Sequence, residues 1–399
     1  MRPTLIITSL TLASLGASEM RAAAQTSAAP AQSNRVAAAF DRVRSHDFHP
    51  LGEDRFTIDR TLKQHGIADV DDLDWKVRLR AAHDLVLAGT AHAGEISEGL
   101  TDANLHVRYL AALALGVLKA PEAAPALEKA LHDDTDPLVR SQAAMALGQI
   151  ESEHSLDILI ERQASDPSHD VRHQCELSID QIRKKMGSTD ELRAAFVSLD
   201  PAMFETVRVS APASAFTLPD TENAPWSLTA HKGQWVVLIW VFADWCPVCH
   251  GEFRELIELK DDFEQANVAV ATIETHDRYR ARVMVGKEID PKYWFSKKSF
   301  HEEYTRKIWW PHLLDRAGAV GATYGVDPLA FSVHAEYINR PSTIIIDPKG
   351  VVRFAYYGTF WGDRPSIKKT LEMVRNEAFE FENPRRLRAA PATATPPSK

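Results

Sequence analysis

Residues 240–253 read Trp240-Val-Phe-Ala-Asp-Trp-Cys-Pro-Val-Cys-His-Gly-Glu-Phe253 and follow an apolar run that starts at Trp235. This pattern predicts a buried strand that passes directly into a helix. Cys246 is then expected at the start of the helix, and Cys249 one turn inside it. Free N–H groups and the positive end of the helix dipole favour the thiolate of the first sulfur. The pair therefore indicates reversible disulfide chemistry.

A zinc site is the alternative reading of the same two cysteines. Zinc would need two more ligands, and the only other cysteine, Cys175, lies far away in a different kind of segment. Three cysteines also cannot build a structural disulfide framework. We therefore interpret Cys246 and Cys249 as a redox pair and expect neither a metal nor a cofactor.

The start of the chain has the features of an export signal. Arg2 precedes an apolar stretch, Leu5–Ala17, that is too short to cross a membrane, and small residues follow at Ala22–Ala24. An uncleaved anchor is the alternative. We expect residues 1–24 to be removed, leaving an exported chain without a membrane span. That chain would be periplasmic if the source is a Gram-negative bacterium.

Composition sets broad limits on the rest. The 399 residues suffice for two or three domains, and 45% hydrophobic with 25% charged residues is ordinary for a soluble globular protein. The formal net charge of −9 gives no reason to expect nucleic acid as a partner. Residues 25–73 are interpreted as a linker with N-terminal helices, and residues 381–399 as a disordered tail.

An internal repeat begins near residue 74. The pair Val-Arg recurs, and subtraction of its positions gives gaps of 30, 32 and 32 residues, at Val77-Arg78, Val107-Arg108, Val139-Arg140 and Val171-Arg172. Small and apolar residues follow at helical spacing, so each unit is expected to begin with a closely packed helix. Residues 74–200 resemble HEAT-like repeats. The resemblance implies an all-α solenoid that binds a protein partner, with a purely structural role as the alternative.

The repeat also places single residues. Asp102, Asp136 and Asp166 precede the first helices, where a carboxylate can cap free N–H groups. Cys175 lies one 32-residue unit after Ala143, a helix-packing position. We therefore expect Cys175 to be a buried small apolar residue with no part in the chemistry.

Residues 206–380 alternate predicted strands and helices, which favours a central sheet covered by helices. Four motifs occur in order: Ala211-Pro-Ala-Ser-Ala-Phe-Thr-Leu218, Trp245-Cys-Pro-Val-Cys-His-Gly-Glu252, His312-Leu-Leu-Asp315 through Val326, and Arg340-Pro-Ser-Thr-Ile-Ile-Ile-Asp347. Together they resemble the thioredoxin fold of the alkyl hydroperoxide reductase/thiol-specific antioxidant (AhpC/TSA) superfamily and of extracytoplasmic thiol-disulfide reductases. The expected fold class is a HEAT-like solenoid followed by an α/β thioredoxin-like domain.

The resemblance implies roles for individual residues. Cys246 would be the exposed nucleophile and Cys249 the buried resolving cysteine. Pro341 would be a cis-proline facing the disulfide, with a trans proline that opens a strand as the alternative. Trp245 would shield the sulfurs, or only pack in the core. Glu252 would relay protons near Cys249, or be a solvated helix carboxylate.

Two features depart from the family pattern. Thioredoxins place a buried aspartate six residues before the first cysteine, and this chain has Trp240 there. A long extra segment, residues 278–298, follows the second strand. With four aromatic residues it could form a lid or a partner-binding surface, or simply pack over the sheet.

Three functions remain open at this stage. The first is an exported thiol-disulfide oxidoreductase acting on protein thiols or disulfides with a redox partner protein. The second is a peroxiredoxin-like peroxidase with Cys249 as the peroxidatic cysteine and Arg340 near the family's activating arginine. Cys246 stands where that family requires threonine or serine, which counts against it. The third is a solenoid adaptor whose redox domain serves as a docking surface.

Overall fold

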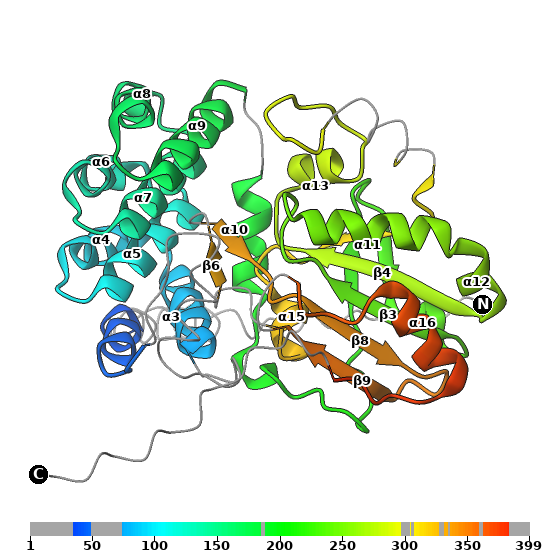
Figure 1. Ribbon diagram of the computed structural model, residues 1–399. Coiled ribbons are helices and arrows are strands. Elements are labelled where there is room, and N and C mark those ends of the chain that lie inside the picture. Colours follow the sequence, from blue (N-terminus) through cyan, green and yellow to red (C-terminus); the bar gives the residue numbers. More distant parts are fainter. Residues whose placement is uncertain are drawn as a thin grey trace, which may run out of the picture.

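The computed structural model shows a helical region followed by a mixed α/β region (Figure 1). The structure describes residues 35–48, 74–184, 188–296, 304, 307–326, 331–333, 336–358 and 362–382. The expected export signal, most of the expected linker and nearly all of the expected tail lie outside these residues. The predicted fold class is confirmed.

The helical region is built from pairs of helices, and residues 35–44 add one more helix before them. The first helices of the pairs are α3 (Asp74–Ala88), α5 (Leu105–Leu118), α7 (Pro137–Ile150) and α9 (His169–Lys184). The second helices are α4 (Ala93–Glu98), α6 (Ala124–Asp133) and α8 (Leu156–Ser165). Each Val-Arg pair lies in a first helix, so the repeat predicted from the sequence is confirmed.

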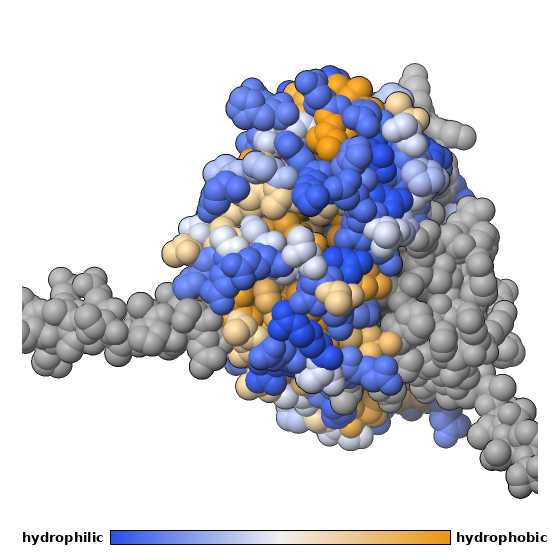
Figure 2. All heavy atoms as spheres, turned by 90° about the vertical axis from the view of Figure 1, so that its left-hand side faces the viewer, coloured by the Kyte–Doolittle hydropathy of each residue, from blue (hydrophilic) through white to orange (hydrophobic). Residues whose placement is uncertain are grey.

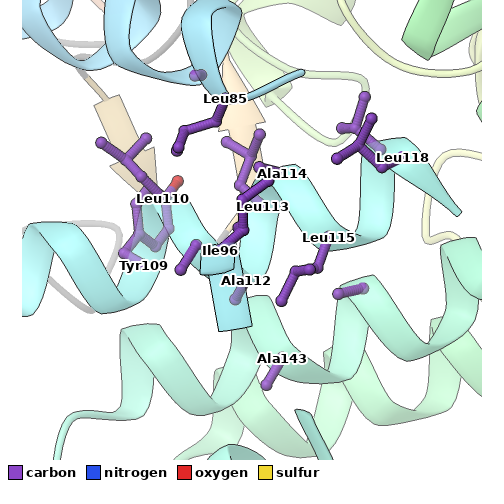
Figure 3. Close-up of a cluster of buried hydrophobic side chains, with 14 of the residues drawn as sticks. Leu85, Ile96, Tyr109, Leu110, Ala112, Leu113, Ala114, Leu115, Leu118 and Ala143 are labelled. Carbon is purple, nitrogen blue, oxygen red and sulfur yellow. The ribbon is translucent and has the colours of Figure 1, made fainter. Parts of the chain in front are cut away.

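The first helices pack closely on one another through small and aliphatic residues. Figure 3 shows this core where α3, α5 and α7 meet, with Leu85, Leu113 and Ala143 among its side chains. Gly116 on α5 has no room for a side chain, because a Cβ there would lie 2.7 Å from the Cα of Ala146 on α7. The repeated glycine therefore sets the distance between neighbouring units.

Buried ion pairs repeat along the stack as well. The Arg108 guanidinium donates to both carboxylate oxygens of Asp134, at 2.7 and 3.1 Å. One unit later Arg140 donates to both oxygens of Asp166, at 3.0 and 2.9 Å. In these two units the arginine of the Val-Arg pair therefore clamps its unit to the next.

The predicted caps are confirmed only in part. Asp136 accepts the backbone N–H of Leu138 and caps α7. The cap of α5 is Asn104, and Asp102 instead accepts the N–H of Asn104. Asp166 likewise binds the N–H of Ser168, before α9. The prediction of helix caps was wrong for Asp102 and Asp166. Their carboxylates instead accept an N–H within the loop before the helix and bind an arginine side chain.

Helix α10 (Thr189–Val197) lies across the first helices and contacts α3 and α5. The His83 ring nitrogen Nδ1 lies 2.7 Å from the carbonyl oxygen of Phe196, and the Thr189 hydroxyl donates to the carbonyl of Gln149. The solenoid therefore covers this face with its own chain. The opposite face, formed by the second helices, is mostly hydrophilic with apolar residues in separate patches (Figure 2).

The α/β region contains a five-stranded sheet in the order β5-β4-β3-β8-β9. Its strands are β3 (Trp235–Trp240), β4 (Val268–Glu274), β5 (His312–Leu314), β8 (Ser342–Ile346) and β9 (Val352–Tyr357). The first three run parallel, and β8 and β9 are antiparallel to their neighbours. Two small hairpins are separate from this sheet, β1 (Thr217–Pro219) with β2 (Pro225–Ser227) and β6 (Phe331–Val333) with β7 (Glu336–Ile338).

Helices cover the sheet as expected. One face carries α11 (Pro247–Glu258), α12 (Lys260–Gln265) and α16 (Ile367–Asn376) (Figure 1). Helix α15 (Ala319–Thr323) packs against the solenoid, since Ala317 and Ala322 belong to the solenoid core. Helix α13 (Arg278–Met284) opens the extra segment. In the described part of the chain, no helix is both long and apolar enough to cross a membrane.

Candidate functional site

The two cysteines lie where the strand-to-helix pattern predicted them. β3 ends at Trp240, and Cys246 is the N-cap of α11, with its sulfur accepting the backbone N–H of Cys249 at 3.4 Å. Both are free thiols, and so is the buried Cys175 in the solenoid. The prediction that Cys175 is a buried apolar residue is confirmed, and burial raises the pKa of its thiol to about 12.

Neither sulfur of the pair is exposed. Cys246 is only 1% exposed, so the expectation of an exposed nucleophile was wrong. Trp294, from the extra segment 278–298, donates its indole N–H to the carbonyl of Trp245 at 3.1 Å and stays 43% exposed itself. Trp294 and Phe295 also pack against the ring of His250 on α11. The described part of the extra segment therefore lies over the start of the redox helix.

A buried arginine completes the site. Arg364 lies between β9 and α16, and its Nη2 is 3.3 Å from the sulfur of Cys249 and 2.8 Å from a carboxylate oxygen of Glu252. Its Nη1 donates to the carbonyl of Trp240 at 3.3 Å. Sequence reasoning missed Arg364, because no local motif marks a residue 115 positions after the cysteine it contacts.

The arginine decides which sulfur carries the charge. Burial would raise the pKa of Cys249, but the hydrogen bond from Cys246 and the charge of Arg364 lower it to about 5. Burial and the neighbouring Cys249 sulfur hold the pKa of Cys246 well above its ordinary value. The reduced pair therefore has its thiolate on Cys249, and not on Cys246 as the helix N-terminus alone suggested.

Glu252 lies beside this charge. Burial raises the pKa of its carboxyl to about 8, although the positive charge of Arg364 opposes the rise. Glu252 and the Cys249 thiolate thus share one guanidinium. At neutral pH Glu252 holds a proton beside the arginine that contacts the Cys249 sulfur, which suits the proton relay expected from the sequence.

Comparisons with known proteins identify the two regions of the chain. Residues 209–355 match the AhpC/TSA family, and residues 67–141 and 95–180 match HEAT repeats. The chain carries an AhpC/TSA thioredoxin-like domain behind HEAT repeats.

Individual relatives each cover less than half of this chain. The thiol:disulfide interchange protein DsbE of Allochromatium vinosum is 28% identical over 165 residues, which are 41% of this chain and 74% of that protein. A reduced 2-Cys peroxiredoxin of Plasmodium vivax is 18% identical with a TM-score of 0.34, covering 42% of this chain and 80% of its own. The peroxidoxin BcpB of Mycobacterium tuberculosis is 21% identical with a TM-score of 0.33, and the match covers 43% of this chain and 97% of that chain.

Two residues expected at the AhpC/TSA site take different positions. The peptide bond before Pro341 is trans, so the expected cis-proline was wrong. Pro341 directly precedes β8, and its carbonyl accepts the N–H of Gly358. This is an ordinary place for a trans proline, which lacks an N–H to donate within a sheet. Arg340 donates to the carbonyl of Gly358 and lies over the ring of Tyr357, while Arg364 is the arginine at the sulfur.

Trp240 stands where thioredoxins have a buried aspartate, and it makes an apolar contact there. Trp240 is fully buried against Tyr324 in the core on the other side of the sheet. Trp245 is partly buried and packs edge-on against Phe242, near the sulfurs it was expected to shield. No group of three or more histidine, cysteine or acidic side chains among the described residues is placed to hold a metal ion.

Proposed function

We propose that this protein is an exported thiol-disulfide oxidoreductase in which Cys246 and Cys249 form the redox pair and the solenoid binds a protein partner. The observation that carries the proposal is the position of the two sulfurs at the N-terminus of α11: the Cys246 sulfur accepts the backbone N–H of Cys249, and the Cys249 sulfur lies 3.3 Å from Nη2 of Arg364. Two adjacent thiols that share one proton can exchange a disulfide with a substrate. The name of the DsbE relative is consistent with this chemistry.

The reaction follows from the positions of the two sulfurs. Cys246, at the N-terminus of α11, passes its proton to the Cys249 thiolate and attacks a substrate disulfide. The substrate S–S bond breaks, a mixed disulfide forms on Cys246, and the departing substrate thiolate takes the proton from Cys249. Cys249 then attacks Cys246, releases the second substrate thiolate and closes the Cys246–Cys249 disulfide. The substrate gains two electrons, a reduced partner protein restores the pair, and the reverse path oxidises substrates.

Peroxidase activity is the second candidate, and the Cys249 thiolate beside Arg364 favours it. A small peroxide could reach a buried sulfur that a protein disulfide cannot. The Cys249 thiolate would attack one peroxide oxygen, the O–O bond would break, and hydroxide would leave while a sulfenic acid forms. Cys246 would then condense with that acid, giving a disulfide and water.

Turnover of the purified protein tests the choice. We expect rapid reduction of a protein disulfide with dithiothreitol as electron donor, and little consumption of hydrogen peroxide. Cys246→Ser should abolish disulfide reduction, whereas Cys175→Ala should not change it because Cys175 lies in the solenoid core. Peroxide turnover that exceeds disulfide turnover in the wild type, together with a sulfenic acid trapped on Cys249 in Cys246→Ser, would contradict the proposal and establish the peroxidase.

A further inference from the structure

A cavity lies where the solenoid meets the AhpC/TSA domain, and neither redox cysteine lines it. Its volume is about 130 Å³. The solenoid contributes residues from α7, α9 and α10, among them Gln174 and Gln181. The AhpC/TSA domain contributes Thr275–Asp277, directly after β4, and Arg316, two residues after β5. Ligands of open α/β sheets bind at the carboxyl ends of parallel strands, which is where these residues lie.

Arg316 is the unsatisfied group of this cavity. Its Nε and Nη1 atoms are buried and have no hydrogen-bond partner among the described residues. Burial lowers the pKa of its guanidinium, although the carboxylates of Asp277, Glu191 and Glu274 oppose that change. A buried cation without hydrogen bonds is unfavourable unless an acceptor reaches it.

The nearby carboxylates already have other partners. Asp277 caps α13 by accepting the N–H of Arg280. Glu191 pairs with Arg278, and Glu274 lies between the rings of two histidines. None of these three acids approaches Arg316 closely enough for an ion pair, and Asp277 is the one carboxylate among the described lining residues. An acceptor for Arg316 would therefore have to come from outside the described residues.

The opposite wall also favours a negative ligand. Ser188 and Thr189 line the cavity, and they are the N-cap and first residue of α10, which is nine residues long. The positive end of the α10 dipole therefore lies at the cavity. The guanidinium and the helix end approach the same space from the two regions of the molecule.

The volume of the cavity and the geometry of the Arg316 guanidinium limit the class of ligand that would fit. A cavity of about 150 Å³ accepts a benzene-sized molecule, so 130 Å³ suits about four to six non-hydrogen atoms. The planar fork of a guanidinium matches a carboxylate, which it can bind through two parallel hydrogen bonds. We propose that this cavity binds a small carboxylate anion, held by Arg316 and bridging the solenoid and the AhpC/TSA domain.

Calorimetric titration of the full-length protein tests the proposal, with sodium acetate as probe and sodium chloride at equal ionic strength as reference. We expect saturable acetate binding and a concentration-dependent rise in melting temperature. Arg316→Gln should weaken binding about tenfold or more, because it removes a charge-assisted hydrogen bond. Arg375→Gln makes the same charge change on α16 and should bind acetate as the wild type does.

A second variant covers the case in which Arg316→Gln does not fold. Gln181→Trp keeps the charge but fills the cavity, and it should abolish acetate binding while circular dichroism stays unchanged. Sodium phosphate serves as the competing oxyanion. The proposal is overturned if acetate does not saturate, if Gln181→Trp binds it normally, or if phosphate binds more tightly than acetate. All readouts are independent of the cysteines, so they do not depend on the proposed redox function.

Discussion

Arg364 is the residue that most changes the chemistry expected of the pair. A helix N-terminus favours a thiolate on the first cysteine, but a full positive charge 3.3 Å from the second sulfur outweighs half a charge at the helix end. The thiolate therefore lies on Cys249, and Cys246 provides its hydrogen bond. The pair can keep a reactive charge buried until a substrate reaches Cys246.

Replacing this arginine tests that account. Arg364→Met should raise the pKa of Cys249 from about 5 by about 1–3, since it removes the neighbouring positive charge. The pH dependence of iodoacetamide alkylation, followed by mass spectrometry of the Cys249 peptide, measures this pKa. Arg353→Met on β9 is the matched control and should leave it unchanged. An unaltered pKa in Arg364→Met would show that another group stabilises the thiolate.

The carboxyl group of Glu252 should give disulfide reduction a second dependence on pH. Its carboxyl has a pKa near 8, so it is neutral below that pH and negative above it. Once negative, it competes with the Cys249 thiolate for Arg364 and disfavours that thiolate. Disulfide reduction should therefore change slope near pH 8 in the wild type and lose this inflection in Glu252→Gln. The same inflection in both proteins would exclude Glu252 as its source.

At the scale of elements, the paired arginines and aspartates hold the solenoid units together. The side chains of Arg140 and Asp166 are 8% and 0% exposed, so the pair lies out of water. Removal of one partner from a buried ion pair leaves an uncompensated charge, which is strongly destabilising.

Asp166→Asn should therefore lower the free energy of unfolding by about 3–5 kcal/mol. Urea denaturation followed by circular dichroism measures the change. Glu264→Gln on α12 removes an exposed partner of Lys260 and should cost no more than about 1 kcal/mol. Equal losses in the two variants would mean that the Arg140–Asp166 pair does not hold adjacent units.

At the scale of the whole molecule, residues 278–296 of the extra segment connect the solenoid to the redox site. Lys292 pairs with Asp180 and Glu176 on α9, and two residues later Trp294 contacts the carbonyl of Trp245. A protein bound to the solenoid could therefore shift Trp294, which covers the chain beside Cys246.

Lys292→Met should make the position of Trp294 beside Cys246 less fixed. Loss of a partly exposed ion pair of about 1 kcal/mol predicts alkylation of Cys246 about fivefold faster than in the wild type. Lys260→Met breaks an exposed pair elsewhere and is the control. Unchanged alkylation of Cys246 in Lys292→Met would mean that Trp294 holds its position without the solenoid.

The features that depend on local sequence patterns were predicted correctly. The contacts between residues far apart in the sequence were not predicted. The repeat and the strand-to-helix position of the cysteines could be read because spacing along the chain decides them. Arg364 and the position of Trp294 could not, since both depend on how distant segments pack over α11. The cis bond at Pro341 was carried over from a resemblance, and this chain has a trans bond there.

The most direct measurement of the central claim locates the first adduct. Cys246→Ser and Cys249→Ser are each treated with a protein disulfide and with hydrogen peroxide, and the modified cysteine is identified by mass spectrometry. We predict that Cys249→Ser accumulates a mixed disulfide on Cys246, and that Cys246→Ser traps almost none. A mixed disulfide formed mainly on Cys249 in Cys246→Ser would contradict this account by making Cys249 the attacking sulfur, and a sulfenic acid formed there would assign peroxidase chemistry to the site.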